Sequence, residues 1–256
     1  MIRKQKKSKA RRRRGVFFLI LLLILILAYI FLFSPLFKIK SIDILGNKEV
    51  SEEQIKNYFN YKNIFLFTEA KIKADLVRKI PKIVDIRVKK DIKDIFKRKI
   101  KLIIQEREKI GIVCQMDSSS AEAIEDKCFY IDKEGVVFEN ALQTSGSLIL
   151  LIKDYSQREF VLGKKLFEEN LINNILEIRE NLFLETGIKS LDFNILSFPP
   201  NDLKVMTNEG WYIIFSLERN INSQITALKA ALEEKIQKRE NLEYIDLRIE
   251  NRIYYK

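Results

Sequence analysis

The stretch VFFLILLLILILAYIFLF, residues 16–33, decides the architecture because it contains eighteen consecutive residues without a charge. The uncharged stretch continues through Phe37. An α-helix rises about 1.5 Å per residue, so this length covers the roughly 30 Å hydrocarbon core of a bilayer. We therefore predict a transmembrane helix over residues 16–36. Its anchoring side chains include Val16, Phe17, Leu21, Leu25, Tyr29 and Phe33.

Positive charge is concentrated just before this stretch. Residues 1–15 carry nine Lys and Arg side chains and no acidic residue, whereas the whole chain has a formal net charge of +11. The positive-inside rule places this tail in the cytoplasm and the residues from about Ser34 onward outside. Because the charge belongs to a tail and not to a folded module, it gives little support for nucleic-acid binding. The topology signal comprises Arg11, Arg12, Arg13 and Arg14.

A cleaved signal peptide is the alternative explanation of this segment. Its apolar core would hold about 7–15 residues and end at a small-x-small cleavage site. The core here is longer, and Phe-Ser-Pro-Leu-Phe follows it without an Ala-x-Ala site. The pattern favours an uncleaved anchor.

The composition excludes several catalytic chemistries. The chain has no histidine, which rules out Ser-His-Asp and Cys-His catalysis and His-ligated metal sites. Its two cysteines are too few for a four-Cys zinc site. No nucleophile or oxyanion motif accompanies Asp132 or Asp246, and there is no Gly-rich phosphate loop. We therefore predict a protein that is not an enzyme and has no catalytic residue, cofactor or metal.

Residues 37–107 predict a small α+β domain. IKSIDILGN, residues 39–47, alternates in the manner of a strand and ends in a Gly-Asn turn. Two helices follow, one after Ser51 and one after Thr68 as N-caps, and Pro81 ends the second. Two alternating strands complete the order strand, helix, helix, strand, strand. In this order two helices can cover one face of a three-stranded sheet.

Residues 108–256 predict a mixed β domain with two helices and a C-terminal strand. Glu209-Gly210 is typical of a hairpin turn, and Gly187 marks the end of the first helix. The second helix is expected over residues 222–241. The final segment, EYIDLRIENRIYYK, predicts a strand that runs almost to the last residue. Termini are usually loose unless they are tied down, so this strand must pair with a sheet.

Several segments, taken in order, resemble one family. FKIKSIDILGN, NIF, LVRKIPKIVDIRVKK and IQERE, within residues 37–108, are similar to a polypeptide-transport-associated (POTRA) domain. FYIDKEGVVFE and YIDLRIENRIYYK are similar to a β domain that ends in Asp-Leu-Arg after a helix. With the basic tail and the single span, this order resembles the FtsQ/DivIB bacterial cell-division proteins. The implied divisions are 1–15 (cytoplasmic tail), 16–36 (transmembrane helix), 37–107 (POTRA domain) and 108–256 (β domain).

The resemblance implies a non-enzymatic scaffold of the divisome in the bacterial cytoplasmic (inner) membrane, at the division septum. It implies FtsB/DivIC-like and FtsL-like single-span partners, and no nucleic acid or small-molecule substrate. The helix of residues 68–80 and the strand after it would serve septal recruitment, although an ordinary charged helix face is the alternative. Two other functions stay open, namely a membrane-anchored POTRA-containing secretion or assembly factor and an envelope enzyme such as a wall hydrolase.

The closing strand is where the resemblance places partner docking. In the family the last strands pair with a segment of the FtsB-like partner, so that a free sheet edge gains a strand. The alternative is that alternate residues of the strand simply pack in the core. The expected contacts are Tyr244, Asp246, Arg248, Ile249, Arg252 and Tyr254, with Tyr255 as a further aromatic anchor.

Cys114 and Cys128 are fourteen residues apart on the predicted outer side. A disulfide between them would close a loop and stabilise the fold by about 3 kcal/mol in the chain-entropy model. Two free cysteines packed inside strands are the alternative.

Overall fold

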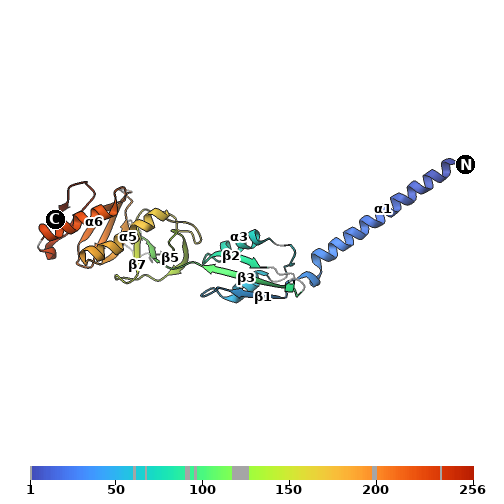
Figure 1. The fold of residues 1–256 in the computed structure, drawn as a ribbon, viewed down its shortest axis with the longest axis horizontal. Helices are drawn as coiled ribbons and strands as arrows, with labels where there is room; N and C mark the ends of the chain where they lie inside the picture. The colour runs from blue at the N-terminus through green and yellow to red at the C-terminus, as the bar shows by residue number, and fades with distance from the viewer. Residues whose placement is uncertain are drawn as a thin grey trace. The chain divides into compact units, whose positions relative to one another are not determined.

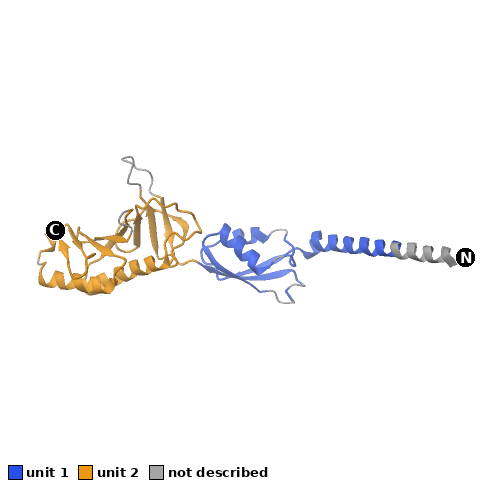
Figure 2. Cartoon of the chain, turned by 90° about the horizontal axis from the view of Figure 1, so that it is seen from above, with its two compact units in different colours: residues 1–106 blue, residues 107–256 orange. Residues whose placement is uncertain are grey.

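The computed structural model describes residues 2–59, 62–66, 68–89, 93–94, 97–116, 127–197, 201–236 and 238–256, with the backbone alone for residues 2–14. The chain divides into two compact units, residues 1–106 and 107–256 (Figure 2). The fold is mixed α+β with one apolar N-terminal helix, which confirms the predicted class. Figure 1 labels several elements of each unit.

The first unit begins with α1, Ile2–Phe33, and its part from Gly15 to Phe33 is apolar and long enough to cross a membrane. The predicted helix over residues 16–36 was too long at its C-terminal end. Proline disfavours a helical conformation in the residue before it, and Ser34, which precedes Pro35, is extended. The Ser34 Oγ accepts the N–H of Leu36 and so caps the short 3₁₀ turn η1, Pro35–Phe37.

A three-stranded sheet follows in the predicted order of strand, helix, helix, strand, strand. β3 lies in the middle, parallel to β1 and antiparallel to β2. The elements are β1 Ser41–Leu45, α2 Glu52–Phe59, α3 Glu69–Lys79, β2 Ile83–Lys89 and β3 Lys99–Glu106. Apolar side chains of both helices and all three strands share one core, which includes Ile55, Phe59, Ile72, Leu76, Ile83, Ile100 and Leu102.

Local sequence signals set the ends of these elements. The Thr68 hydroxyl accepts the N–H of Lys71, so the predicted N-cap of α3 is confirmed. Gly46 adopts φ +84 after β1, and a Cβ there would lie 2.4 Å from the Ile104 carbonyl oxygen. Only glycine fits this close approach between β1 and β3 without moving the backbone.

The second unit is built on one large sheet. Among its described residues, nine strands follow the order β12-β11-β10-β9-β8-β7-β4-β5-β6. Its elements are β4 Gly111–Gln115, β5 Lys127–Ile131, β6 Val137–Ala141, β7 Leu150–Asp154, α5 Glu169–Thr186, β8 Ser190–Ile195, β9 Asp202–Thr207, β10 Tyr212–Ser216, α6 Ile221–Glu234, η2 Arg239–Asn241, β11 Tyr244–Asp246 and β12 Tyr254–Tyr255.

The helices α5 and α6 contact each other and share one core with the sheet. Gly187 ends α5 with φ +74, as predicted, and the Glu209-Gly210 turn joins β9 to β10. The last helix was predicted to reach Asn241, but α6 ends at Glu234. Ile236 lies beyond that end and is still buried against the core.

The C-terminal segment departs most from the prediction of one continuous strand. β11 is parallel to β10 and ends at Asp246, and β12 folds back antiparallel onto the outer side of β11. A turn between them contains Asn251 in the left-handed region, with φ 59. β12 is therefore the end strand of the sheet, and β11 is an inner strand.

Candidate partner interface at the C-terminal hairpin

The C-terminal hairpin, residues 244–256, is tied to the sheet along β10. The N–H of Leu247 donates to the Ile214 carbonyl at 3.0 Å, and the N–H of Tyr212 donates to the Glu243 carbonyl at 3.2 Å. Ile245 and Leu247 point into the core and are buried. The predicted alternation of core and surface residues thus holds as far as Leu247. It fails at Ile249, whose side chain is 51% exposed.

Asp246 breaks the strand by bonding its own following backbone. Its Oδ1 accepts the N–H of Arg248 at 3.0 Å, a local turn that competes with strand pairing. The same carboxylate accepts from the Arg248 guanidinium at 2.9 and 2.7 Å. These contacts turn the chain away from β10 and begin the connection to β12.

Arg248 bridges the hairpin to a distant strand. Its Nε and Nη2 donate to Asp246, and its Nη1 forms an ion pair with Asp202 at the start of β9. The hydrogen bonds that Arg248 donates to Asp246 and then to Asp202 raise the pKa of its guanidinium. Burial opposes ionisation of Asp246, but the Arg248 bonds together outweigh it and hold the pKa of that carboxyl below its usual value. Arg248 therefore stays charged and holds the hairpin in place.

β12 presents an open edge. Lys256 and Tyr244 exchange backbone hydrogen bonds of 3.2 and 3.3 Å. Because alternate residues of an antiparallel strand bond to the same neighbour, the N–H and C=O of Tyr255 point away from β11. The side chains of Tyr254 and Tyr255 are 46% and 50% exposed. Such an edge can accept another strand.

A groove runs beside this edge. It lies between α6 and the turn of the hairpin and has a volume of about 540 Å³. Its wall on α6 includes the small residues Ala227, Ala230 and Ala231, and its wall on the hairpin includes Ile249 and Tyr255. Charged residues, among them Glu234, Lys235, Glu250 and Arg252, line it as well, so the groove can take both apolar and charged side chains of a segment that approaches the edge.

The six predicted contact residues separate into two groups. Tyr244 stacks on Tyr212 at 5.6 Å, and Asp246 and Arg248 bind each other, so these three serve the sheet and hairpin. Ile249, Arg252 and Tyr254 are exposed in the connection or on β12. Sequence reasoning did not find Asp202, because it is separated from Arg248 by 46 positions and no local pattern links them.

The remaining predicted residues lie outside the hairpin, on α1, α3, β4 and β5. The anchor side chains from Val16 to Phe33 are exposed on α1, and the four arginines lie where only the backbone is described. Cys114 and Cys128 stand opposite each other on β4 and β5 and form a disulfide. On the charged end of α3, Arg78 forms an ion pair with Asp75 at 3.5 Å.

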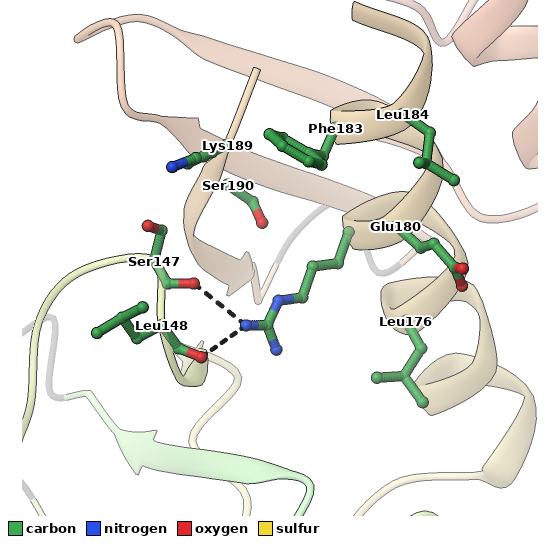
Figure 3. A pocket seen from close by; sticks show the side chains of 9 residues that line it. Ser147, Leu148, Leu176, Glu180, Phe183, Leu184, Lys189 and Ser190 are labelled. Atoms are coloured by element: carbon green, nitrogen blue, oxygen red, sulfur yellow. Dashed lines mark hydrogen bonds between the residues drawn. The ribbon is translucent and has the colours of Figure 1, made fainter. Parts of the chain in front are cut away.

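A second groove, with a volume of about 630 Å³, lies beside α5 (Figure 3). Arg179 donates to the carbonyls of Ser147 and Leu148 at 3.1 and 2.9 Å, so its guanidinium holds the loop that forms one wall. Phe183 and Leu184 of α5 also line the groove. Within the described part of the chain, no group of three His, Cys, Asp or Glu residues is placed to hold a metal ion.

No family model matches this chain, and no curated protein matches it either.

Proposed function

We propose that this chain is a non-enzymatic, membrane-anchored scaffold of the bacterial divisome, of the FtsQ/DivIB type. Its N-terminal tail would lie in the cytoplasm, and both units would act outside the membrane at the septum. The observation that carries the proposal is the open edge at β12, with two exposed tyrosines and a groove beside it. A scaffold needs such a docking edge and no catalytic group.

The partner would be an FtsB/DivIC-like protein, accompanied by an FtsL-like one. A strand of that partner adds to β12 through the outward backbone groups of Tyr255, and its next side chains enter the groove along α6. Ile249, Tyr254 and Tyr255 form the contact surface. Arg248 acts as a positioning residue, because its guanidinium already binds Asp246 and Asp202.

The first unit would serve as a POTRA domain. Its element order and its sheet order β1-β3-β2, with the helical side chains packed in the same core, support this assignment. Apolar residues Gly15–Phe33 of α1 support the single membrane anchor.

A proline substitution tests strand addition without disturbing the core. Tyr255→Pro removes the outward N–H and places a ring in the path of an added strand. Tyr255→Thr keeps the N–H and loses only the aromatic ring. Removing the hairpin altogether is less informative, because Ile245 and Leu247 are buried and their loss would unfold the sheet.

The experiment is co-purification of the full chain in detergent with co-expressed FtsB/DivIC-like and FtsL-like proteins of the source cell. Tyr255→Pro should weaken binding about tenfold or more, since a lost hydrogen bond and a clash together cost about 1.5 kcal/mol or more. Tyr255→Thr should weaken it less. Equal binding by the native chain, Tyr255→Pro and Tyr255→Thr would show that the partner does not bind at the edge of β12. Capture of unfolded outer-membrane chains instead would indicate a secretion factor, and hydrolysis of peptidoglycan an envelope enzyme.

A further inference from the structure

Three phenylalanine rings gather where α1 ends. The Phe31 ring lies 5.1 Å from that of Phe37 and 5.4 Å from that of Phe65, and the last two are 5.8 Å apart. Phe31 belongs to the last turn of the apolar part of α1. Phe65, although 34 positions later in the sequence, therefore lies at the same level as the end of the apolar helix.

Hydrogen bonds fix the loop of residues 62–66 in this place. The N–H of Ile64 donates to the Phe37 carbonyl at 2.8 Å, and the N–H of Ile39 donates to the Lys62 carbonyl at 3.0 Å. The buried Asn63 side chain donates to the Phe31 carbonyl at 2.7 Å and accepts the N–H of Phe65 at 2.9 Å. The loop is thus attached both to the end of α1 and to the chain that leaves it.

The tip of this loop exposes large apolar side chains. Ile64 is buried in the core of the unit, whereas the next two residues, Phe65 and Leu66, are 48% and 53% exposed. Leu36, in the turn after α1, is exposed as well. Exposed apolar groups that gather beside the end of a spanning helix are typical of side chains at a membrane surface.

The charged residues of these two segments are all cations. Lys38 and Lys40 follow the turn, and residues 34–42 and 62–68 contain no acidic residue. The guanidinium of Arg98 donates to the Pro35 carbonyl at 3.1 Å, which places another cation beside the turn. Lys and Arg side chains near a bilayer surface attract anionic lipid headgroups.

We propose that Leu36, Phe65 and Leu66 form a lipid-binding patch that enters the surface of the bilayer where α1 emerges, with Lys38, Lys40 and Arg98 against anionic headgroups. This inference rests on the proposed anchoring by α1. The bilayer then holds the first unit at two places, the span and the loop. A membrane surface is the occupant because Phe65 touches the last turn of the spanning helix itself.

A fluorescent probe attached to cysteine tests this in the full chain. Both native cysteines are disulfide-bonded, so an introduced cysteine is the only free thiol. Leu66→Cys reports the patch. Leu45→Cys is the matched control, because Leu45 is also an exposed leucine, 54% against 53%, but lies at the far end of β1. Leu25→Cys reports the span itself.

Each variant is labelled with an environment-sensitive nitrobenzoxadiazole dye and reconstituted in vesicles of phosphatidylcholine and phosphatidylglycerol that contain a headgroup-region spin-labelled lipid. At Leu66 we expect emission at shorter wavelength and loss of most of the fluorescence to the spin label, and at Leu45 a water-like spectrum. The quenching at Leu66 should weaken in vesicles of phosphatidylcholine alone.

The outcomes separate the two proposals. If the dye at Leu25 is protected in the bilayer but the dye at Leu66 behaves like that at Leu45, the lipid-binding patch is wrong and the anchor stands. If the dye at Leu25 is itself in water, the anchor is wrong. If Leu66 is shielded without any quenching by lipid, the chain itself or a second copy of it covers the loop, and the lipid assignment is overturned.

Discussion

The two end strands of the nine-stranded sheet, β6 and β12, differ in what bonds to their outer edges. At one end the backbone of residues 163–165 covers the start of β6, with the N–H of Gly163 donating to the Val137 carbonyl at 2.7 Å. At the other end β12 has two residues, and no described strand pairs with its outer edge. We call the first the closed end, because the start of its last strand is bonded to another segment, and the second the open end.

The closed end is also reinforced internally. The disulfide joins β4 to β5, and the carboxylate of Asp132 binds Arg107 and the backbone N–H groups of Glu134 and Val136. Gly135 permits the tight turn before β6, since a Cβ there would lie 2.0 Å from the Phe167 carbonyl oxygen. The open end instead has the Arg248 cluster, in which the arginine is about one-third exposed and the carboxylates of Asp202 and Asp246 are mostly buried. The closed end is thus held by a covalent bond and a buried ion pair, whereas the open end is the one that we propose for partner binding.

The largest expected effect is at the closed end. Arg107→Ala leaves the carboxylate of Asp132 buried without its cation, and removing one partner of a buried pair costs about 3 kcal/mol or more. Both side chains are almost fully buried, at 8% and 6% exposure. Urea unfolding of the full chain in detergent measures this loss, because the single tryptophan, Trp211, is buried in the second unit and reports its unfolding.

Lys109→Ala is the matched control for that variant. Lys109 pairs with Glu139 at 2.9 Å on the same end of the sheet, but both side chains are about one-third exposed. An exposed pair contributes only about 0–1 kcal/mol. If the two variants lose the same free energy of unfolding, the buried pair of Arg107 and Asp132 stabilises the fold no more than the exposed pair does.

Loss of the disulfide should have the next largest effect. Replacing Cys114 and Cys128 together with alanine should lower the free energy of unfolding by about 3 kcal/mol. Partner binding at β12 should stay unchanged, because the disulfide lies at the other end of the sheet. The urea midpoint of the Trp211 fluorescence transition measures the loss of stability. Co-purification measures partner binding. Dithiothreitol should shift the midpoint of the native chain and leave that of the double variant unchanged.

Arg248→Ala should have an intermediate effect at the open end. It removes hydrogen bonds to two partly buried carboxylates, and we expect a loss of about 1–2 kcal/mol at neutral pH. Partner binding should weaken as well, because the hairpin loses its attachment to Asp202. Arg252→Ala, in the exposed part of the same hairpin, should leave the free energy of unfolding unchanged. A loss of stability in both variants would mean that Arg248 has no particular positioning role.

The Arg248 cluster also predicts that the free energy of unfolding depends on pH in the acid range. The pKa of Asp246 is lower in the folded chain than its usual value of 3.8, so the carboxylate stabilises the fold above that pH. This stabilisation is lost as the pH falls through the lower folded pKa. Urea midpoints measured from neutral pH down to acid should fall less steeply for Arg248→Ala than for the native chain. Parallel curves would exclude this contribution.

The smallest effect on stability should come from Tyr255→Pro. Its outward N–H has no role in pairing with β11, so the free energy of unfolding should change by less than about 0.5 kcal/mol. Tyr254→Pro is the contrast, because Tyr254 pairs with Asp246 and a lost ladder bond costs about 1 kcal/mol. If Tyr255→Pro destabilises as much as Tyr254→Pro, the edge at β12 is not the free one.

Much of the fold could be predicted because its signals are local. The apolar stretch before Phe33, the cap at Thr68 and the left-handed glycine at Gly187 each act within a few residues of chain. Alternating apolar residues likewise identified the strands of the first unit and their order. Such features depend on local backbone preferences and on the spacing of apolar residues, and both can be read from the amino-acid sequence.

The candidate site depended on contacts between distant positions. The sequence by itself indicated one strand over most of residues 243–256, but in the structure the strand ends at Asp246, where Arg248 pairs with Asp202, and β12 folds back onto β11. The pairing of Cys114 with Cys128 was open until the strand register placed them opposite each other. Sheet order and register are set by packing of the whole core, so only the tertiary structure decided which edge is open.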